Sequence, residues 1–358
     1  MSRFSILPKA KLAEWIDWLI GEYRVFAPRR HQGGHTFAPI ASAVEVDLTY
    51  AQTLLPPKKC IIPQRELLYS YDLGGMRLKA NVQATPTVVF GVHSCDQHAL
   101  RLFDRIFSHG FTDQHYRLQR EQTLIIGLDC LSPCTDQSFC RSMGTTSPAP
   151  DVFDLHLVDL GQDYCIEIGT AGGATLTQFS GFFAASDVDL ERRNHVLQQK
   201  WERFPYRLDC DVTDLPPLLS HAYTSSHWQT LGDQCLACGM CTQVCPTCYC
   251  FNIDDRVNLT LTEGQRFRSW DSCQVNDFAM VAGGHNFREK RAARQRHRFM
   301  RKGKYQYDAN DMVGCVGCGR CATACLVHIT PISTFNELWR QKLEQDSARK
   351  NSTEEGQP

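Results

Sequence analysis

Hydrophobic positions in the first two hundred residues form short apolar runs separated by helix-spaced segments. Residues 87–92 (TVVFGV) and 123–128 (TLIIGL) are continuous apolar runs of strand length, which is typical of buried strands. The segment between them, SCDQHALRLFDRIF, has helical spacing, and Ser94 and Gln97 predict a capping box at its start. We therefore expect a parallel strand–helix–strand unit.

The same patterns predict further helices and two hairpins. Helical periodicity is found at residues 1–23, with Leu12, Trp15, Ile16 and Leu19 on one face, at 186–204 and at 332–346. Alternating segments predict one hairpin at 151–170, turning at Gly161–Asp163, and another at 256–273, turning around Glu263–Gly264. Together with the strand–helix–strand unit, these elements predict an α+β fold.

The chain has 358 residues, which is long enough for two domains. We expect an N-terminal α/β domain at 1–215 and a mostly helical, ferredoxin-like domain at 216–340 with an insertion at 251–310. A connection between them is predicted near residues 214–219. The end of the chain, 341–358, is polar, and its last residues, 347–358, are expected to be disordered.

Composition narrows the class of protein. A net charge of −1 gives no overall field that would attract nucleic acid or membrane. No apolar run approaches the length of a spanning helix, and the first 23 residues lack a signal-peptide pattern. The 18 cysteines are clustered, which argues against a disulfide scaffold. We therefore expect a cytoplasmic protein whose thiols bind metal.

Two cysteine runs share the spacing C-x2-C-x2-C-x3-C, one starting at Cys235 and the other at Cys315. This is the spacing of bacterial ferredoxins, in which a tight loop offers three thiolates to a 4Fe-4S cluster. Gly239 and Gly319 allow the backbone of each loop to curl. A zinc site is the alternative, but it would use two C-x2-C pairs and leave thiols over. The runs therefore predict two 4Fe-4S clusters, which together would conduct single electrons.

The fourth cysteine of each ferredoxin run usually reaches the other cluster. Each predicted cluster accordingly takes three cysteines from one run and one from the other. The first set is Cys235, Cys238, Cys241 and Cys325, and the second is Cys315, Cys318, Cys321 and Cys245.

Four more cysteines follow the two predicted parallel strands, where sites gather in an open α/β sheet. They are Cys95, Cys130, Cys134 and Cys140. A third metal site, with an iron–sulfur cluster as candidate, is one interpretation. A zinc site, a redox disulfide, a catalytic Cys95 flanked by His93 and His98, and plain buried cysteines are the others. The amides at the predicted helix start would favour Cys95 as a thiolate.

Three further thiols, Cys248, Cys250 and Cys273, follow the first run. They are either additional ligands, thiol donors around the clusters, or packing residues. The strongly basic stretch 288–304 predicts a solvated helix face, a cationic neighbour of the clusters, or a nucleic-acid surface.

Several segments together resemble one family. They are YRVFAP (23–28), HSCDQHAL (93–100), CPTCYC (245–250), WDSC (270–273), AGGHN (282–286) and GCVGCGRC (314–321). These segments are similar to the beta subunit of soluble sulfhydrogenases, a group of nickel–iron hydrogenases, and to the 4Fe-4S dicluster subunit of anaerobic sulfite reductase. The second run departs from the ferredoxin pattern at Leu326, where proline is usual.

The resemblance implies a cytoplasmic electron-transfer subunit of a multisubunit oxidoreductase. Its partners would be a flavin subunit that uses NAD(P) and a catalytic subunit of the hydrogenase or sulfite reductase type. The resemblance also supports the interpretation of the four N-terminal cysteines as metal ligands. The alternative function is an enzyme in its own right, with flavin or Cys95 chemistry in the N-terminal domain. A nucleic-acid-binding sensor would rest on the basic stretch alone.

Overall fold

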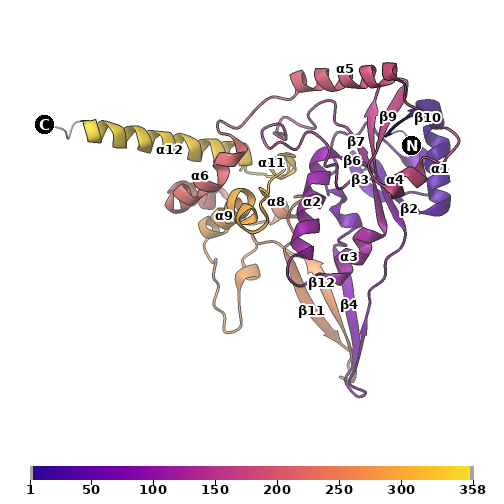
Figure 1. Cartoon of the computed structure of the whole chain (residues 1–358). Coiled ribbons are helices and arrows are strands. Elements are labelled where there is room, and N and C mark those ends of the chain that lie inside the picture. Colours follow the sequence, from indigo (N-terminus) through magenta and orange to yellow (C-terminus); the bar gives the residue numbers. More distant parts are fainter. Residues whose placement is uncertain (1–2, 355–358) are drawn as a thin grey trace.

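An eight-stranded sheet organises the N-terminal part of the chain in the computed structural model, which describes residues 3–354 (Figure 1). The strand order is β10-β1-β9-β8-β7-β6-β2-β3. Its strands are β1 Phe4–Pro8, β2 Arg24–His31, β3 Gly34–Pro39, β6 Thr87–His93, β7 Thr123–Leu128, β8 Leu155–Asp159, β9 Asp163–Ile168 and β10 Phe183–Ala184. The four central strands β2, β6, β7 and β8 run parallel, and the outer pairs are antiparallel.

The predicted strand–helix–strand unit is confirmed. Strands β6 and β7 pair in parallel, and α2 (Ser94–Ser108) connects them. Every residue of β6 is buried, as its continuous apolar run predicts. The capping box is wrong, because Ser94 is the first helical residue after the N-cap His93 and makes no cap. Gln97 instead donates to the carbonyl of Val92.

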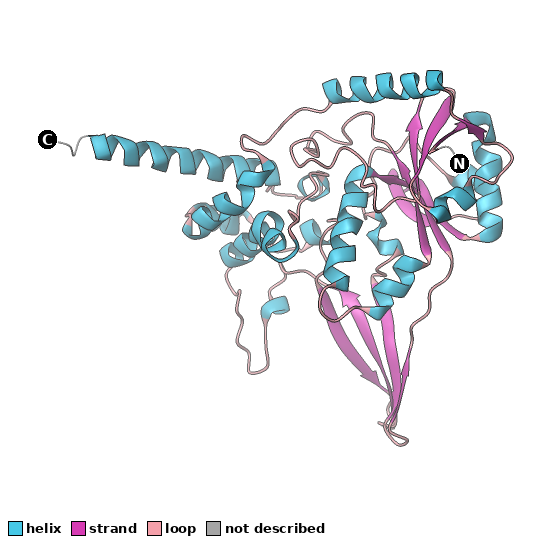
Figure 2. Ribbon diagram, viewed as in Figure 1, coloured by secondary structure: helices cyan, strands magenta, loops and turns pink. Residues whose placement is uncertain are grey.

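Helices α1 Leu12–Glu22, α3 Gln114–Glu121, α4 Ala171–Leu176 and α5 Asp187–Arg203 lie around this sheet (Figure 2). In α1 the predicted apolar face holds, with Trp15, Ile16 and Leu19 buried. The helix does not extend to the start of the chain, however. Residues Phe4–Pro8 form strand β1, which pairs antiparallel with β9.

A second, four-stranded sheet combines strands from the two predicted domains. Its order is β11-β12-β4-β5, with β4 Arg65–Asp72, β5 Arg77–Ala80, β11 Phe251–Val257 and β12 Glu263–Trp270. The hairpin of the predicted insertion is present, but its turn lies at residues 258–262, before the predicted Glu263–Gly264. Both of those residues are already paired with β4. In Figure 1 this sheet projects away from the large one.

The remaining helices build the other end of the molecule. They are α6 Leu215–His221, α7 His227–Gln234, α8 Met240–Gln243, α9 Arg291–Met300, a π-helical turn Arg301–Tyr305, α10 Gln306–Asn310, α11 Arg320–Thr323 and α12 Pro331–Glu354. Single 3-10 turns occupy Lys9–Lys11, Ala43–Glu45, Pro57–Cys60, Val212–Asp214, Ala222–Thr224 and Asp277–Ala279. A separate apolar core lies here, with Leu215, Trp228, Phe299 and Phe335 at its centre.

Two expectations about this end need correction. The segment near 214–219 is mostly helix α6, whose Leu215, Leu218 and Leu219 are buried, and it is no exposed connection. Residues 347–354, expected to be disordered, continue α12, which extends away from the body (Figure 1). The last residues of the predicted tail, 355–358, lie outside the described part. None of the helices within residues 3–354 has the length and apolarity needed to cross a bilayer.

Candidate metal centres

The two cysteine runs fold into similar loops. Gly239 and Gly319 adopt φ of +76° and +77°, and each is followed by a short helix, α8 or α11. This left-handed conformation costs glycine little and other residues more, so both glycines act as predicted. Each helix carries the last thiol of its run away from the loop.

Four thiols of the predicted second set surround one hollow. Cys315, Cys318 and Cys321 from the second run and Cys245 from the first all line it, together with Cys241 of the predicted first set. Thr247, the cations Arg298 and Lys302, and apolar groups that include Phe139, Val316 and Phe299 complete its wall. Burial raises the pKa of the Cys315 thiol to about 12, whereas the hydrogen bond from Cys248 lowers the pKa of Cys245 well below its ordinary value.

The predicted first set is less enclosed. Cys235 is buried and its sulfur accepts a hydrogen bond from Gln295 Nε2 at 2.8 Å, whereas Cys238 is exposed. The sulfur of Cys325 accepts one from the amide of Ile329 at 3.4 Å. Cys235 and Cys325 both pack into the apolar core of this end. Their joint ligation of one cluster stays a prediction.

Buried cations test whether an anionic group fits these sites. Lys58 and Arg298 are each only 4% exposed, and Lys302 is half-buried. In the described part of the chain none of the three pairs with a carboxylate. Lys58 donates to the carbonyl of Cys248, Arg298 contacts the side chain of Gln295 and the thiol of Cys321, and Lys302 contacts the hydroxyl of Thr247 and the thiol of Cys245. Burying unpaired cations is expensive. Thiolates of an iron–sulfur cluster carry the missing negative charge, so the residues fit such a group.

The charge on these cations follows from their neighbours. Burial disfavours the charge on Arg298 and Lys302, yet the adjacent thiols, with Cys241 and Cys245 the strongest, hold their pKa values above the ordinary ones. For Lys58 burial prevails over Cys248 and lowers its pKa to about 8. Sequence analysis missed Lys58, which lies far from the cysteine runs, and left Arg298 and Lys302 within the basic stretch.

Thiols of the N-terminal set lie near the second run. Cys130 and Cys134 are hydrogen-bonded to each other, and Cys134 Sγ lies 3.8 Å from His93 Nδ1. Ligand atoms of these three residues fall within 4.8 Å of one another. Cys95 and Cys140 pack together with Cys318 and Val316 of the second run.

His93 was not predicted as a member of this group. It ends strand β6, and Tyr50 stacks on its ring with centroids 4.3 Å apart. Its position at the carboxyl end of a parallel strand was the signal that sequence analysis could have used. Cys95 is not an activated thiolate, since burial and Asp96 raise its pKa well above the usual range. The structure therefore does not favour Cys95 as a nucleophile.

Direct backbone contact joins this group to the second run. The amide of Phe139 donates to the carbonyl of Gly317 at 2.7 Å. Gly317 has φ of +67°, and a Cβ there would lie 2.6 Å from the amide nitrogen of Cys140. Beside this contact, Arg320 forms a buried two-pronged ion pair with Asp96, at 2.6 and 2.8 Å.

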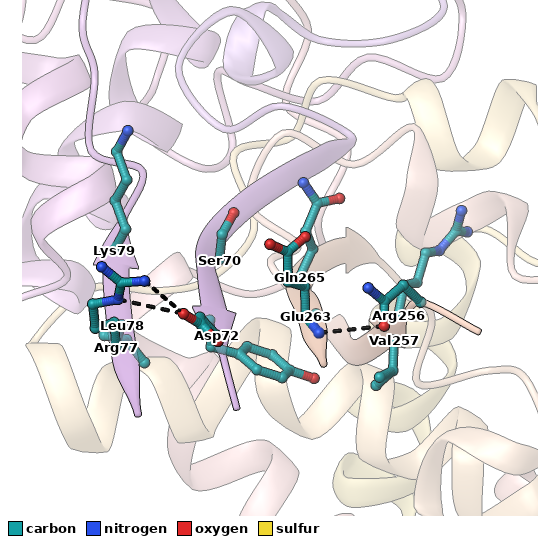
Figure 3. A pocket seen from close by; sticks show the side chains of 12 residues that line it. Ser70, Asp72, Arg77, Leu78, Lys79, Arg256, Val257, Glu263 and Gln265 are labelled. Atoms are coloured by element: carbon teal, nitrogen blue, oxygen red, sulfur yellow. Dashed lines mark hydrogen bonds and ion pairs between the residues drawn. The ribbon is translucent and has the colours of Figure 1, made fainter. Parts of the chain in front are cut away.

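Two other surfaces contribute less to redox chemistry. Within the basic stretch, Arg294 and Arg298 are buried, so fewer of its cationic side chains can contact nucleic acid. An open hollow at the end of the small sheet is lined by polar residues such as Arg256 and Glu263, with an ion pair between Arg77 and Asp72 (Figure 3). No cysteine is among the residues lining it.

Comparison with known proteins agrees with this geometry. Residues 234–329 match the family model of a 4Fe-4S dicluster domain. The chain is similar to "Sulfhydrogenase 2 subunit beta" of Pyrococcus furiosus, with 32% identity over 318 residues, covering 88% of this chain and 92% of that protein. No solved structure matches the chain.

Proposed function

Because the chain belongs to the family of sulfhydrogenase beta subunits, we propose that it is the electron-transfer subunit of a hydrogenase-type complex. It relays single electrons between a flavin subunit that uses NAD(P) and a catalytic subunit, in the cytoplasm. Its cofactors are two 4Fe-4S clusters on the paired runs and a third iron–sulfur cluster at Cys95, Cys130, Cys134 and Cys140.

The contact between two thiol groups supports this proposal most. Cys95 and Cys140 pack against Cys318, which lines the hollow of the second set. Thiol groups in such contact suit a relay, whereas an isolated cluster would suit a purely structural role. Iron–sulfur clusters at these positions supply reversible one-electron chemistry.

The residues around the thiols serve such a relay in two ways. Phe139, Val316 and Phe299 give the hollow a partly apolar wall, which limits the number of solvent dipoles that must reorient when charge moves. Arg298 and Lys302 keep positive charge beside the sulfurs and thereby offset the negative charge of the reduced state.

The proposal is tested by expressing the tagged chain anaerobically with its neighbouring subunits. The tagged chain should co-purify with a flavoprotein and a catalytic subunit, and NAD(P)H should bleach its cluster absorbance only when the flavoprotein is present. Hydrogen or sulfite assays on the complex then identify the catalytic type.

The chain purified alone should be reduced by dithionite and show no turnover with hydrogen or sulfite. Turnover by the isolated chain, or flavin bound to it in stoichiometric amount, would favour the alternative of an enzyme in its own right.

A further inference from the structure

Three thiols that the paired runs do not use surround a second hollow. Cys248, Cys250 and Cys273 line it. The thiols of Cys250 and Cys273 are hydrogen-bonded to each other. The amide of Asp271 donates to the carbonyl of Cys250 at 2.9 Å, which fixes the two segments side by side. The sequence brings these thiols from CPTCYC and WDSC, on opposite sides of the β11–β12 hairpin.

The second hollow adjoins the first, and the thiols of Cys245 and Cys248, one from each, are hydrogen-bonded to each other. The first hollow is lined by five thiols that are absent from the wall of the second: Cys241, Cys245, Cys315, Cys318 and Cys321. Thr247, Arg298 and Lys302 line both, so they form the wall between the two. Arg298 and Lys302 therefore lie beside both groups of thiols.

The surroundings of the second hollow carry an excess of positive charge. Arg298, Arg301 and Lys302 line it, and Lys58 lies at its edge, donating to the carbonyl of Cys248 at 2.6 Å. Arg301 is directed to the hydroxyl of Tyr249, and no carboxylate is among the lining residues. A single anionic group in the first hollow would leave Arg301, on the far side of the wall, without an anionic neighbour.

We propose that Cys248, Cys250 and Cys273 bind an additional iron–sulfur cluster through three thiolates. The cluster is either a three-iron type or a 4Fe-4S type whose fourth iron takes a ligand other than cysteine. The proposal of this site does not depend on the proposed electron relay between partner subunits, because it concerns only which cofactor the chain binds.

The charge of the pocket favours a cluster over the simpler alternatives. A disulfide between Cys250 and Cys273 would remove negative charge and leave the cations unbalanced. A single zinc ion would bring two positive charges into a pocket that already has several, and structural zinc prefers four protein ligands. Three thiolates around a cluster keep a net negative charge, which the cations match.

The test uses the full chain, reconstituted with iron and sulfide without oxygen. Cys250→Ser and Cys273→Ser should each lose about three or four iron atoms per chain relative to wild type. Cys60→Ser is the control, since Cys60 is buried to a similar degree (6% exposed) in the core beside the large sheet and should lose none. Cys245→Ser should lose a different cluster, so the double variant Cys245→Ser/Cys273→Ser should lose both.

Spectroscopy distinguishes the two cluster types. An oxidised three-iron cluster has an odd number of electrons and gives an electron paramagnetic resonance signal that Cys273→Ser abolishes. A 4Fe-4S cluster with one unusual ligand is diamagnetic when oxidised, and its distinct iron appears in the Mössbauer spectrum.

Wild-type iron content in Cys250→Ser and Cys273→Ser, loss of zinc in place of iron, or a double variant that loses no more iron than Cys245→Ser alone would each overturn the proposal. Circular dichroism checks that the variants fold. If these variants unfold while Cys60→Ser does not, the spectra of the wild-type chain provide the test. The proposal is then overturned if those spectra contain neither a three-iron signal nor a Mössbauer component from an iron without a cysteine ligand.

Discussion

The charge of a single side chain, Lys302, acts on two thiol-lined sites. Its amino group donates to Thr247 Oγ1 at 2.5 Å, and Thr247 lies 3.3 Å from the sulfur of Cys245. The lysine lines both thiol-lined hollows. Its charge therefore acts on whatever either hollow contains.

Replacing Lys302 by methionine should lower the reduction potential of the adjacent cluster. A unit charge a few ångströms away at an effective dielectric near 20 corresponds to a shift on the order of 100 mV. Anaerobic redox titration followed by electron paramagnetic resonance measures it. Lys304→Met is the control, because Lys304 pairs with Asp308 at 2.9 Å and lines neither hollow. Equal potentials in the two variants would contradict the assigned role.

Cys134 tests the N-terminal site at the same scale. Cys134→Ser should remove about four iron atoms and one cluster's spectral signal, and leave the ferredoxin pair intact. Iron analysis and electron paramagnetic resonance of the full chain measure this. Simultaneous loss of all clusters would mean instead that Cys134 is needed for folding.

Residue types and regular spacing made part of the site predictable. The two runs determine eight candidate ligands because their spacing is repeated. The N-terminal set is spaced irregularly, so only its position after the strands pointed to a site. The position of His93 at the end of a parallel strand was available but unused, whereas Lys58 could not be assigned, since its nearness to thiols depends on segments distant in the chain.

An ion pair and a backbone hydrogen bond connect α2, α11 and their neighbouring loops. Asp96 follows Cys95 on α2, Arg320 begins α11, and their ion pair is almost fully buried. The amide of Phe139 and the carbonyl of Gly317 fix the neighbouring loops. Packing of these elements, and not only metal binding, holds the two thiol groups together.

Asp96→Ala should therefore destabilise the chain by about 3–5 kcal/mol, because it leaves Arg320 buried and unpaired. Asp151→Ala, which breaks the exposed pair with Arg101, should cost less than about 1 kcal/mol. Anaerobic urea unfolding monitored by circular dichroism gives both values. A cost below about 1 kcal/mol for Asp96→Ala would show that the pair contributes little.

Elements were predictable where one local pattern dominates. The apolar runs of β6 and β7 were recognisable as buried strands, because parallel strands that are covered on both faces are apolar throughout. Strand β1 was missed because its five residues adjoin a stronger helical pattern. The turn of the β11–β12 hairpin was misplaced because pairing with β4, nearly two hundred residues away, sets where β12 begins.

At the scale of the whole molecule, the small sheet joins distant parts of the chain. Strand β12 pairs with β4 along most of its length, from Glu263 to Ser269. The boundary predicted at residue 215 therefore separates strands that pair with each other. This connection has a direct consequence for fragments.

A fragment of residues 216–340 should be less stable than the same region in the full chain. Its β12 would expose an unpaired edge, which promotes association between copies. Size-exclusion chromatography should show aggregates, and co-expression with residues 1–215 should restore a monomeric complex with more bound iron. A monomeric fragment that binds as much iron as the full chain would show that the small sheet is dispensable.

The ion pair between Asp96 and Arg320 also has a direction. The carboxylate lies next to Cys95 in sequence, whereas the guanidinium lies within the loop of Cys318 and Cys321. With cofactors in place on both sides, an extra electron near Cys95 is repelled by Asp96, and one near Cys318 is attracted by Arg320. If both sides hold clusters, a pair that stabilises the fold would thus raise the reduction potential beside Cys318 relative to that beside Cys95, which favours electron transfer toward the second run.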